Sequence, residues 1–213
     1  MVWFPLRLDV DPVPAGSTAL IDLALIKQHV RVDHDDEDEL LEMYAAAAIS
    51  WAEGDTHRTI FQRAHRWIIK DFPHFHRMDI RLPRGKTQSV ESIAYVRGGQ
   101  AGTLIGSSSG SPAGTDYQED LRSESGGVLM PPQGGSWPSV DCDVPAPVTV
   151  NFTAGWASVD VPKDLLHAIL FWIADAYDLR GTPDFNPAML NTSGPRFAAR
   201  EALVSSWRMT RWY

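Results

Sequence analysis

The sequence predicts an α+β fold in which a mainly helical domain carries an inserted antiparallel β lobe. Apolar residues recur at helical spacing over residues 21–51 and again over 165–177. Between these segments, β-branched and aromatic residues alternate with polar ones, most clearly over residues 148–153. With 213 residues, 44% of them hydrophobic, the chain is long enough to bury a core in one domain with a protruding lobe.

Residues 1–19 are rich in proline, and we expect them to form an extended arm. The arm contains the apolar residues Trp3, Phe4, Leu6 and Leu8. These side chains could pack on a neighbouring molecule or on the domain itself, and the sequence leaves both alternatives open.

Residues 20–59 predict a helical hairpin. Ile21, Leu25, Ile26 and Val30 describe a short first helix that ends near Val32. A polar run follows, and either of two aspartates in it is a suitable N-cap for the second helix: Asp35 or Asp36. The predicted buried stripe of that helix consists of Leu40, Tyr44, Ala47, Ala48 and Trp51, and the predicted stop is Gly54.

Residues 60–156 predict the inserted β lobe. Strand-like segments occur at residues 66–70, 78–82, 90–96 and 148–153. A Gly/Ser-rich insert over residues 98–115 interrupts them, and its composition favours a mobile loop or hairpin tip with little to bury. The lobe therefore lies between the helical segments along the chain.

Residues 157–181 predict the helix that completes the helical core. Pro162 occupies its first turn, where a missing N–H costs nothing. The predicted buried side, which should pack on the front hairpin, consists of Leu165, Ile169, Trp172, Ile173, Ala176 and Tyr177.

Residues 182–213 predict a linker followed by a C-terminal helix from Phe197 to Met209. This segment is too apolar for a solvated tail and too rich in arginine for a core helix. Arginine and tryptophan are the residue types that most often carry binding energy at interfaces, so we interpret the segment as a docking helix. The alternative, in which the helix folds back on its own domain, stays open.

The stretch LIDLALIKQHVRVDHDDEDELLEMYAAAAISWAEGDTHRT, residues 20–59, resembles the helical front end of the phage head-tail connector (adaptor) family of long-tailed phages and gene transfer agents. The residues that carry this resemblance are Leu23, Lys27, His29, Val30, Arg31, Val32, Asp33, Asp35, Asp36, Asp38, Leu40, Leu41, Ala47, Ala48, Trp51, Glu53 and Arg58. Later stretches fit as well: LPR at 82–84, SVESIAYV at 89–96, GSWP at 135–138, VTVNFTAGW at 148–156, Val161-Pro162, and the helix through Tyr177 and Arg180. The insert after Gly98 and the tail after Arg180 depart from the family pattern.

This resemblance implies a structural role: a ring on the order of twelve copies that joins the portal protein to a stopper or tail protein and continues the DNA channel. It also implies a location at the head-tail interface of a virion or phage-like particle, after synthesis in the bacterial cytoplasm. We expect portal binding by Arg196, Arg200, Leu203, Trp207, Arg208, Arg211, Trp212 and Tyr213. We expect inter-subunit or channel-facing positions for Asp33, Asp35, Asp36, Glu37, Asp38 and Glu39.

The net charge of −8 argues against specific DNA binding, because proteins that grip phosphates do so with clustered Lys and Arg. A negative lumen would instead let DNA slide. The N-terminus has no continuous apolar segment of a signal peptide and the most apolar helix is interrupted by charges, so we expect a soluble, intracellular chain without a membrane partner.

The sequence predicts no active site, metal or cofactor. Cys142 has no companion thiol and no base nearby in sequence. The histidines at 57, 65, 74 and 76 lack a metal-binding spacing, and the acidic run lacks the glycine and the final acid of a calcium loop. Two alternatives remain: a head-completion stopper or tail terminator, and, from a different class, a small ligand-binding or metal-dependent enzyme.

Overall fold

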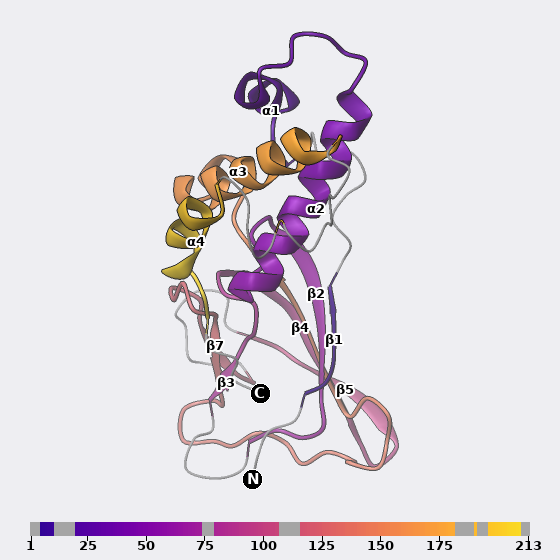
Figure 1. Cartoon of the computed structure of the whole chain (residues 1–213). Coiled ribbons are helices and arrows are strands. Elements are labelled where there is room, and N and C mark those ends of the chain that lie inside the picture. Colours follow the sequence, from indigo (N-terminus) through magenta and orange to yellow (C-terminus); the bar gives the residue numbers. More distant parts are fainter. Residues whose placement is uncertain are drawn as a thin grey trace. The chain divides into compact units, whose positions relative to one another are not determined.

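The computed structural model describes residues 5–10, 20–73, 79–106, 116–181, 190 and 196–209. The chain divides into two compact units. The helical unit comprises residues 12–61 and 157–209, and the β unit comprises residues 1–11, 62–156 and 210–213. This α+β architecture confirms the predicted fold class (Figure 1).

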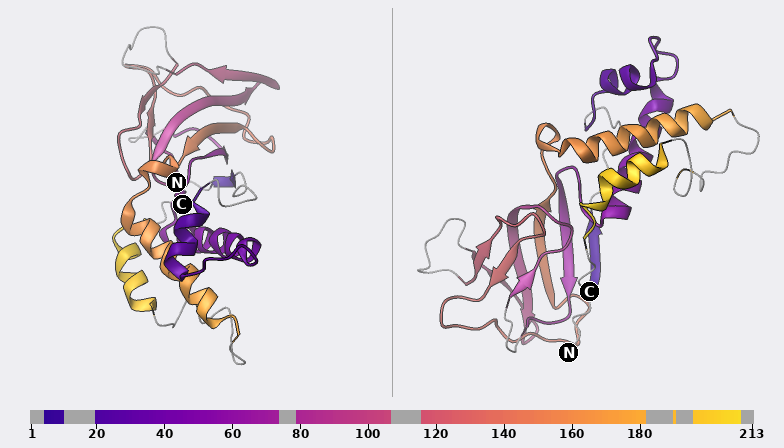
Figure 2. Two further views of the ribbon diagram at one scale, coloured as in Figure 1. Left: turned by 90° about the horizontal axis from the view of Figure 1, so that it is seen from above. Right: turned by 60° about the vertical axis from the view of Figure 1, so that its left-hand side comes forward.

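The helical unit is built around α3 (Lys163–Leu179), which contacts all three other α-helices of the unit. These are α1 (Leu23–Val30), α2 (Asp38–Thr56) and α4 (Phe197–Ser205). A short 3-10 helix, Ser158–Asp160, precedes α3. The views in Figure 2 show α4 running beside α3. The predicted packing of α3 on the front hairpin is confirmed, and α4 folds onto its own unit.

The ends of α1 and α2 follow from their capping residues. The Asp22 side chain accepts a hydrogen bond from the Ala24 N–H at 3.0 Å, and Arg31 closes α1 in a left-handed conformation. The predicted N-cap of α2 at residue 35 or 36 is wrong, because the helix begins at Asp38 with Glu37 as its N-cap. The predicted stop at Gly54 is also wrong, since the helix continues to Thr56 and ends at the left-handed His57.

The buried face of α2 differs from the predicted stripe. The fully buried residues lie mostly one position further along the helix: Leu41, Ala45, Ala48, Ile49, Ala52, Glu53 and Thr56. Ala47 is exposed, and Leu40, Tyr44 and Trp51 are half-buried. Alanine and the flanking large residues supply apolar atoms nearly all round this helix, so apolar spacing alone did not fix which face turns inward.

The β unit contains a five-stranded antiparallel sheet in the order β1-β2-β8-β4-β5. Its strands are β1 (Pro5–Val10), β2 (Arg63–Ile69), β4 (Thr87–Arg97), β5 (Gln100–Leu104) and β8 (Val148–Ala154). A smaller sheet has the order β3-β7-β6, with β3 (Ile80–Arg81), β6 (Gln118–Asp120) and β7 (Val128–Met130). The described part of the N-terminal arm therefore pairs with β2 in its own chain.

The core of the β unit lies on one face of the larger sheet. Strand β8 turns Val148, Val150 and Phe152 inward, as the alternation predicted, while Asn151 and Thr153 are only partly buried. Phe72 and Trp137 stack at 5.0 Å within this core. At the tip of the β4–β5 hairpin, Gly98 and Gly99 both have positive φ, as a tight hairpin turn requires.

Candidate functional site

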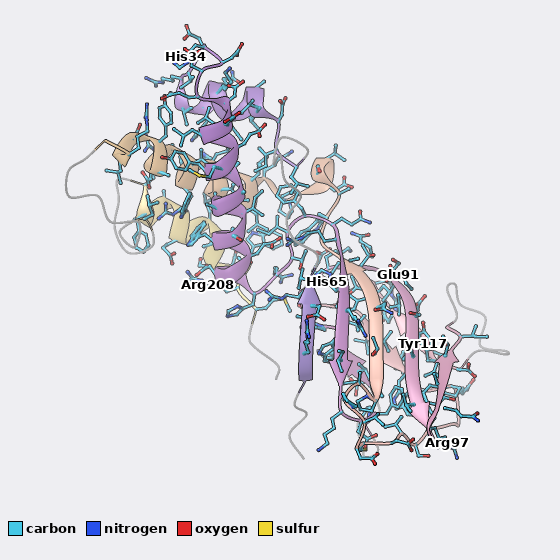
Figure 3. All side chains as sticks on the ribbon, turned by 90° about the vertical axis from the view of Figure 1, so that its right-hand side faces the viewer. His34, His65, Glu91, Arg97, Tyr117 and Arg208 are labelled. Carbon is cyan, nitrogen blue, oxygen red and sulfur yellow. The ribbon has the colours of Figure 1, made fainter. Side chains whose placement is uncertain are left out.

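The acidic run between α1 and α2 forms an exposed loop that is tied down on both sides. Lys27 of α1 contacts Asp35 at 2.5 Å and Asp38 at 2.9 Å. The hydrogen bond from Lys27 holds the pKa of Asp35 below its ordinary value. His34 lies within this loop, at one extremity of the helical unit (Figure 3).

On the other side, Glu37 attaches the loop to α3. Its carboxylate accepts a hydrogen bond from the Tyr177 hydroxyl and contacts Arg180 at 3.0 Å. The Tyr177 hydrogen bond, followed by the charge of Arg180, lowers the pKa of Glu37. The Arg180 guanidinium lies 3.6 Å from the centre of the Tyr177 ring, which holds both side chains in place.

The six predicted acidic residues therefore fall into two groups. Glu37 and Asp38 are half-buried and face partners within the helical unit. Asp33, Asp35, Asp36 and Glu39 are exposed, and of these only Asp35 has an ion-pair partner among the described residues. The second group is available to another molecule, while the first shapes the loop. The inter-subunit or channel-facing position of all six acidic residues stays a prediction.

The C-terminal helix is fixed to α3 by a buried ion-pair network. Asp175 contacts Arg196 at 2.9 Å and Arg200 at 3.2 Å, and the Asp175 and Arg200 side chains have no exposed surface. Arg200 also donates to the Leu190 carbonyl and lies 4.9 Å from the centre of the Trp51 ring. Burial lowers the pKa of Arg200, so its guanidinium depends on these partners.

The residues after α4 are tied to the end of α2. Arg58 donates to the Trp207 carbonyl at 2.6 Å, and Arg208 forms a two-point ion pair with Asp55 at 2.9 and 3.0 Å. Figure 3 shows Arg208 beside the C-terminal end of α2. The Met209 N–H donates to the Thr56 carbonyl at 3.0 Å. These contacts fix where the chain leaves the helical unit.

The structure thus resolves the alternative that the sequence left open, because α4 folds back on its own domain. Arg200 is buried against Asp175, so its side chain has no surface for another molecule in this fold, and its predicted portal contact stays untested. Arg196, Leu203, Trp207 and Arg208 keep partly exposed surface. Arg211, Trp212 and Tyr213 lie outside the described residues. Portal contact by the remaining residues stays a prediction.

Sequence reasoning did not assign a role to Asp175 or to the Tyr177–Glu37 contact. A signal for Asp175 exists, because it is a carboxylate inside the apolar run LFWIADAY. A charge on a buried helix face requires a partner, and in the structure Arg196 and Arg200 supply it.

The described residues contain no group of three or more His, Cys, Asp or Glu side chains that could hold a metal ion. His65 is buried and stacks on Phe152 at 5.0 Å, which is a structural role, whereas His74 and His76 lie outside the described residues. Cys142 is exposed. None of the described helices is both long and apolar enough to span a bilayer.

Comparison with known proteins agrees with this fold. Residues 20–96 match the phage gp6-like head-tail connector protein family. The match confirms the family resemblance for α1, the acidic loop, α2, β2, β3 and most of β4. No curated protein matches the chain significantly.

The chain resembles solved structures over nearly its whole length, as three of them show. In the virion of a native gene transfer agent (GTA) particle, a chain with 22% identity aligns with a TM-score of 0.67 over 96% of both chains. The neck of an empty GTA particle computed with C6 symmetry contains a chain with 22% identity and a TM-score of 0.64, again over 96% of both chains. The neck of a native GTA particle computed with C12 symmetry contains one with 21% identity and a TM-score of 0.59, over 99% of this chain and 97% of that one. The α+β fold is therefore shared with neck proteins.

Proposed function

We propose that this protein is a structural head-tail adaptor of a tailed phage or phage-like gene transfer particle. The observation that carries the proposal is the connector family match over residues 20–96, within a fold shared along almost the entire chain with GTA neck proteins. The adaptor forms a ring of about twelve copies. The ring joins the portal to a stopper or tail protein at the head-tail interface, and its subunits are made in the bacterial cytoplasm.

In this role the chain binds surfaces and catalyses nothing. The DNA passes through the ring without specific contacts, which agrees with the net charge of −8 and with the exposed carboxylates of the acidic loop. Negative charge along a DNA path repels the phosphates and so prevents the DNA from binding to the channel wall.

The test is to mix the purified chain with the portal ring encoded beside it and to image the product by electron microscopy. A ring of density on one end of the portal supports the adaptor assignment. Bare portals, together with binding to heads that already carry another connector, would favour the stopper or terminator instead.

The contribution of the C-terminus is tested in the same experiment with a chain that ends at Met209. This truncation leaves α4 and its ion pairs in place, whereas truncation after Gly194 would remove them. Loss of the ring in the Met209 truncation would assign portal docking to the last four residues. If the truncated chain still forms a ring on the portal, the docking surface would be assigned to the exposed parts of residues 196–209.

A further inference from the structure

The outer edge of β5 is open in the described part of the β unit. Strand β5 is the last strand in the order β1-β2-β8-β4-β5 and pairs with β4 along one side, from Gln100 to Leu104. No described strand pairs with the other side of Gln100–Leu104, and just beyond the strand Gly106 forms an isolated bridge with Tyr117. In Figure 1, β5 is accordingly an outermost strand of the larger sheet.

This edge lacks the features by which proteins protect open strands. Edge strands are normally shielded by charged residues, proline or a bulge, because their free backbone groups would otherwise pair with another chain. Strand β1, at the opposite edge, has all three: Pro5, Arg7, Asp9 and an irregular register between Pro5 and Arg7. Strand β5 reads QAGTL, without charge or proline.

The residues that line this edge are small or apolar and accessible. Ala101 and Thr103 are exposed, and Ile105, which directly follows the strand, exposes 67% of its surface. Ile105 is one of three large hydrophobic residues with such exposure in the described part of the chain, and it adds an apolar contact at the end of the edge.

The edge is also firmly held in position. Leu104 is buried in the core, and the Tyr95 ring covers Gly102 so closely that a Cβ there would lie 2.7 Å from it. The Ile105 N–H donates to Asp116 Oδ2 at 2.9 Å, and the Asp116 N–H donates back to the Ile105 carbonyl at 2.8 Å. A preformed edge loses little conformational entropy when a partner adds to it.

Charge indicates which kind of partner can approach. The helical unit has 16 Asp and Glu against 8 Lys and Arg, so it carries the entire net charge of −8. The β unit has 11 of each and is neutral. Between two copies of this chain, helical units repel one another, whereas β units can meet without this cost.

We propose that neighbouring copies contact each other through their β units, with the open edge of β5 as the surface that receives an extended segment of the next copy. This inference rests on the proposed function for the existence of a ring. The C6 and C12 symmetry of the similar neck structures is what a ring of adjoining copies would have. A β5 edge that receives a different surface of the next copy is a heterologous contact, which closes into a ring.

The test variant is Ala101→Lys/Thr103→Lys, which places two charges along the edge without touching the core. Ser139→Lys, at an exposed position in the same unit, is the control for added charge. A second pair compares Ile105→Asp with Val159→Asp, because Val159 is 82% exposed in the helical unit. Circular dichroism and thermal unfolding establish that all four variants fold.

Two readouts separate this inference from the proposed function. Sedimentation velocity measures self-association of the full chain, and electron microscopy measures ring closure on the purified portal. We expect both edge variants to self-associate about tenfold or more weakly than wild type and to leave rings open, while single subunits still bind the portal. We expect Ser139→Lys and Val159→Asp to self-associate and to close rings like wild type.

Edge variants that associate and close rings like wild type would overturn the proposal, as would equal defects in the two controls. If wild type does not bind the portal, the adaptor assignment fails. The contact through β5 is then tested only by comparing the self-association of wild type and the edge variants. A wild-type chain that stays monomeric at every concentration and on the portal would also overturn it.

Discussion

At the scale of single residues, the contact between Arg200 and Asp175 is the most consequential in the helical unit, because neither side chain reaches solvent. Removing one member of a buried pair leaves an uncompensated charge and typically costs about 3–5 kcal/mol. Arg196 still contacts Asp175 in the variant Arg200→Met, so we expect the free energy of unfolding to fall by about 3 kcal/mol, at the low end of that range.

Urea denaturation followed by circular dichroism measures this loss. The matched control is Arg122→Met, which removes an Arg–Asp contact of 2.9 Å whose arginine is 91% exposed. Exposed pairs contribute about 0–1 kcal/mol, so the control should differ little from wild type. Equal effects of the two variants would show that burial does not set the strength of the Arg200 contact.

The Glu37 carboxylate links loop anchoring to pH. Its pKa is lowered in the folded protein, so it stabilises the fold at pH values above the ordinary pKa of 4.5. That contribution is lost as the pH falls through the lowered value. In Tyr177→Phe, the largest cause of the shift is gone, and we expect an NMR titration to show the pKa of Glu37 moving up toward 4.5.

Tyr44→Phe removes a hydroxyl from a half-buried position of α2 and serves as the control for this titration. An unchanged Glu37 pKa in Tyr177→Phe, or an equal rise in Tyr44→Phe, would contradict the assigned anchoring contact.

At the scale of secondary-structure elements, α4 is part of the helical core and cannot be removed without consequence. It buries Val204 and Arg200, and Asp175 pairs with Arg200 and with the N-cap residue of the helix, Arg196. A chain truncated after Gly194 should therefore lose most of the stability of the helical unit, since Asp175 would be left without either arginine.

The comparison is with the chain that ends at Met209, whose melting temperature should match that of the full chain. Differential scanning calorimetry measures both. A Gly194 truncation that melts like the full chain would mean that α4 contributes little to the core. Its effect on portal binding could then be interpreted as loss of a docking helix, as the sequence alone suggested.

Elements whose large apolar residues lie on one face were predictable from the sequence. The alternation of Val148, Val150 and Phe152 placed these three residues correctly in the core. The buried face of α3 was also largely correct, because its apolar residues are large and most of its polar ones lie on the exposed side, with Asp175 as the buried exception. In α2, four successive alanines fit either face, and only the packing against α3 decides between them.

The position of the acidic loop along the chain was predictable from the sequence. The side chains that anchor the loop were not. The acidic run identified the exposed loop, yet two of its anchors, Tyr177 and Arg180, lie about 140 residues further along the chain, a separation that local patterns do not encode. In the same way, Arg196 and Arg200 look like interface residues in the sequence because arginine is common at interfaces. Asp175 is the partner that makes Arg200 a core residue.

At the scale of the whole molecule, charge is divided between the two units in a way that composition does not reveal. A chain with a net charge of −8 consists of a neutral β unit and a helical unit that holds the entire excess. In the proposed ring, this division separates two tasks. The neutral unit can meet its copies, and the acidic unit can face DNA, which it repels.

The division predicts different results for the same substitution in the two units of the assembled ring. Asp36→Lys in the acidic loop and Asp143→Lys in the β unit each replace a negative charge with a positive one at an exposed position. If the loop lines the DNA path, a ring of Asp36→Lys subunits presents clustered lysines to the phosphates. It should then retain duplex DNA at low salt and release it as salt rises, because binding through lysine contacts releases counterions.

Filter binding of labelled duplex DNA to portal–adaptor complexes, at increasing salt, measures this difference. Wild-type complexes and Asp143→Lys complexes should show equally weak retention, since their lysine content near the DNA path is unchanged. Equal retention by the two variants would mean that the acidic loop does not face the channel. The loop would then be assigned to contacts with the portal or with the next protein of the neck, where exposed carboxylates can pair with basic residues of a partner.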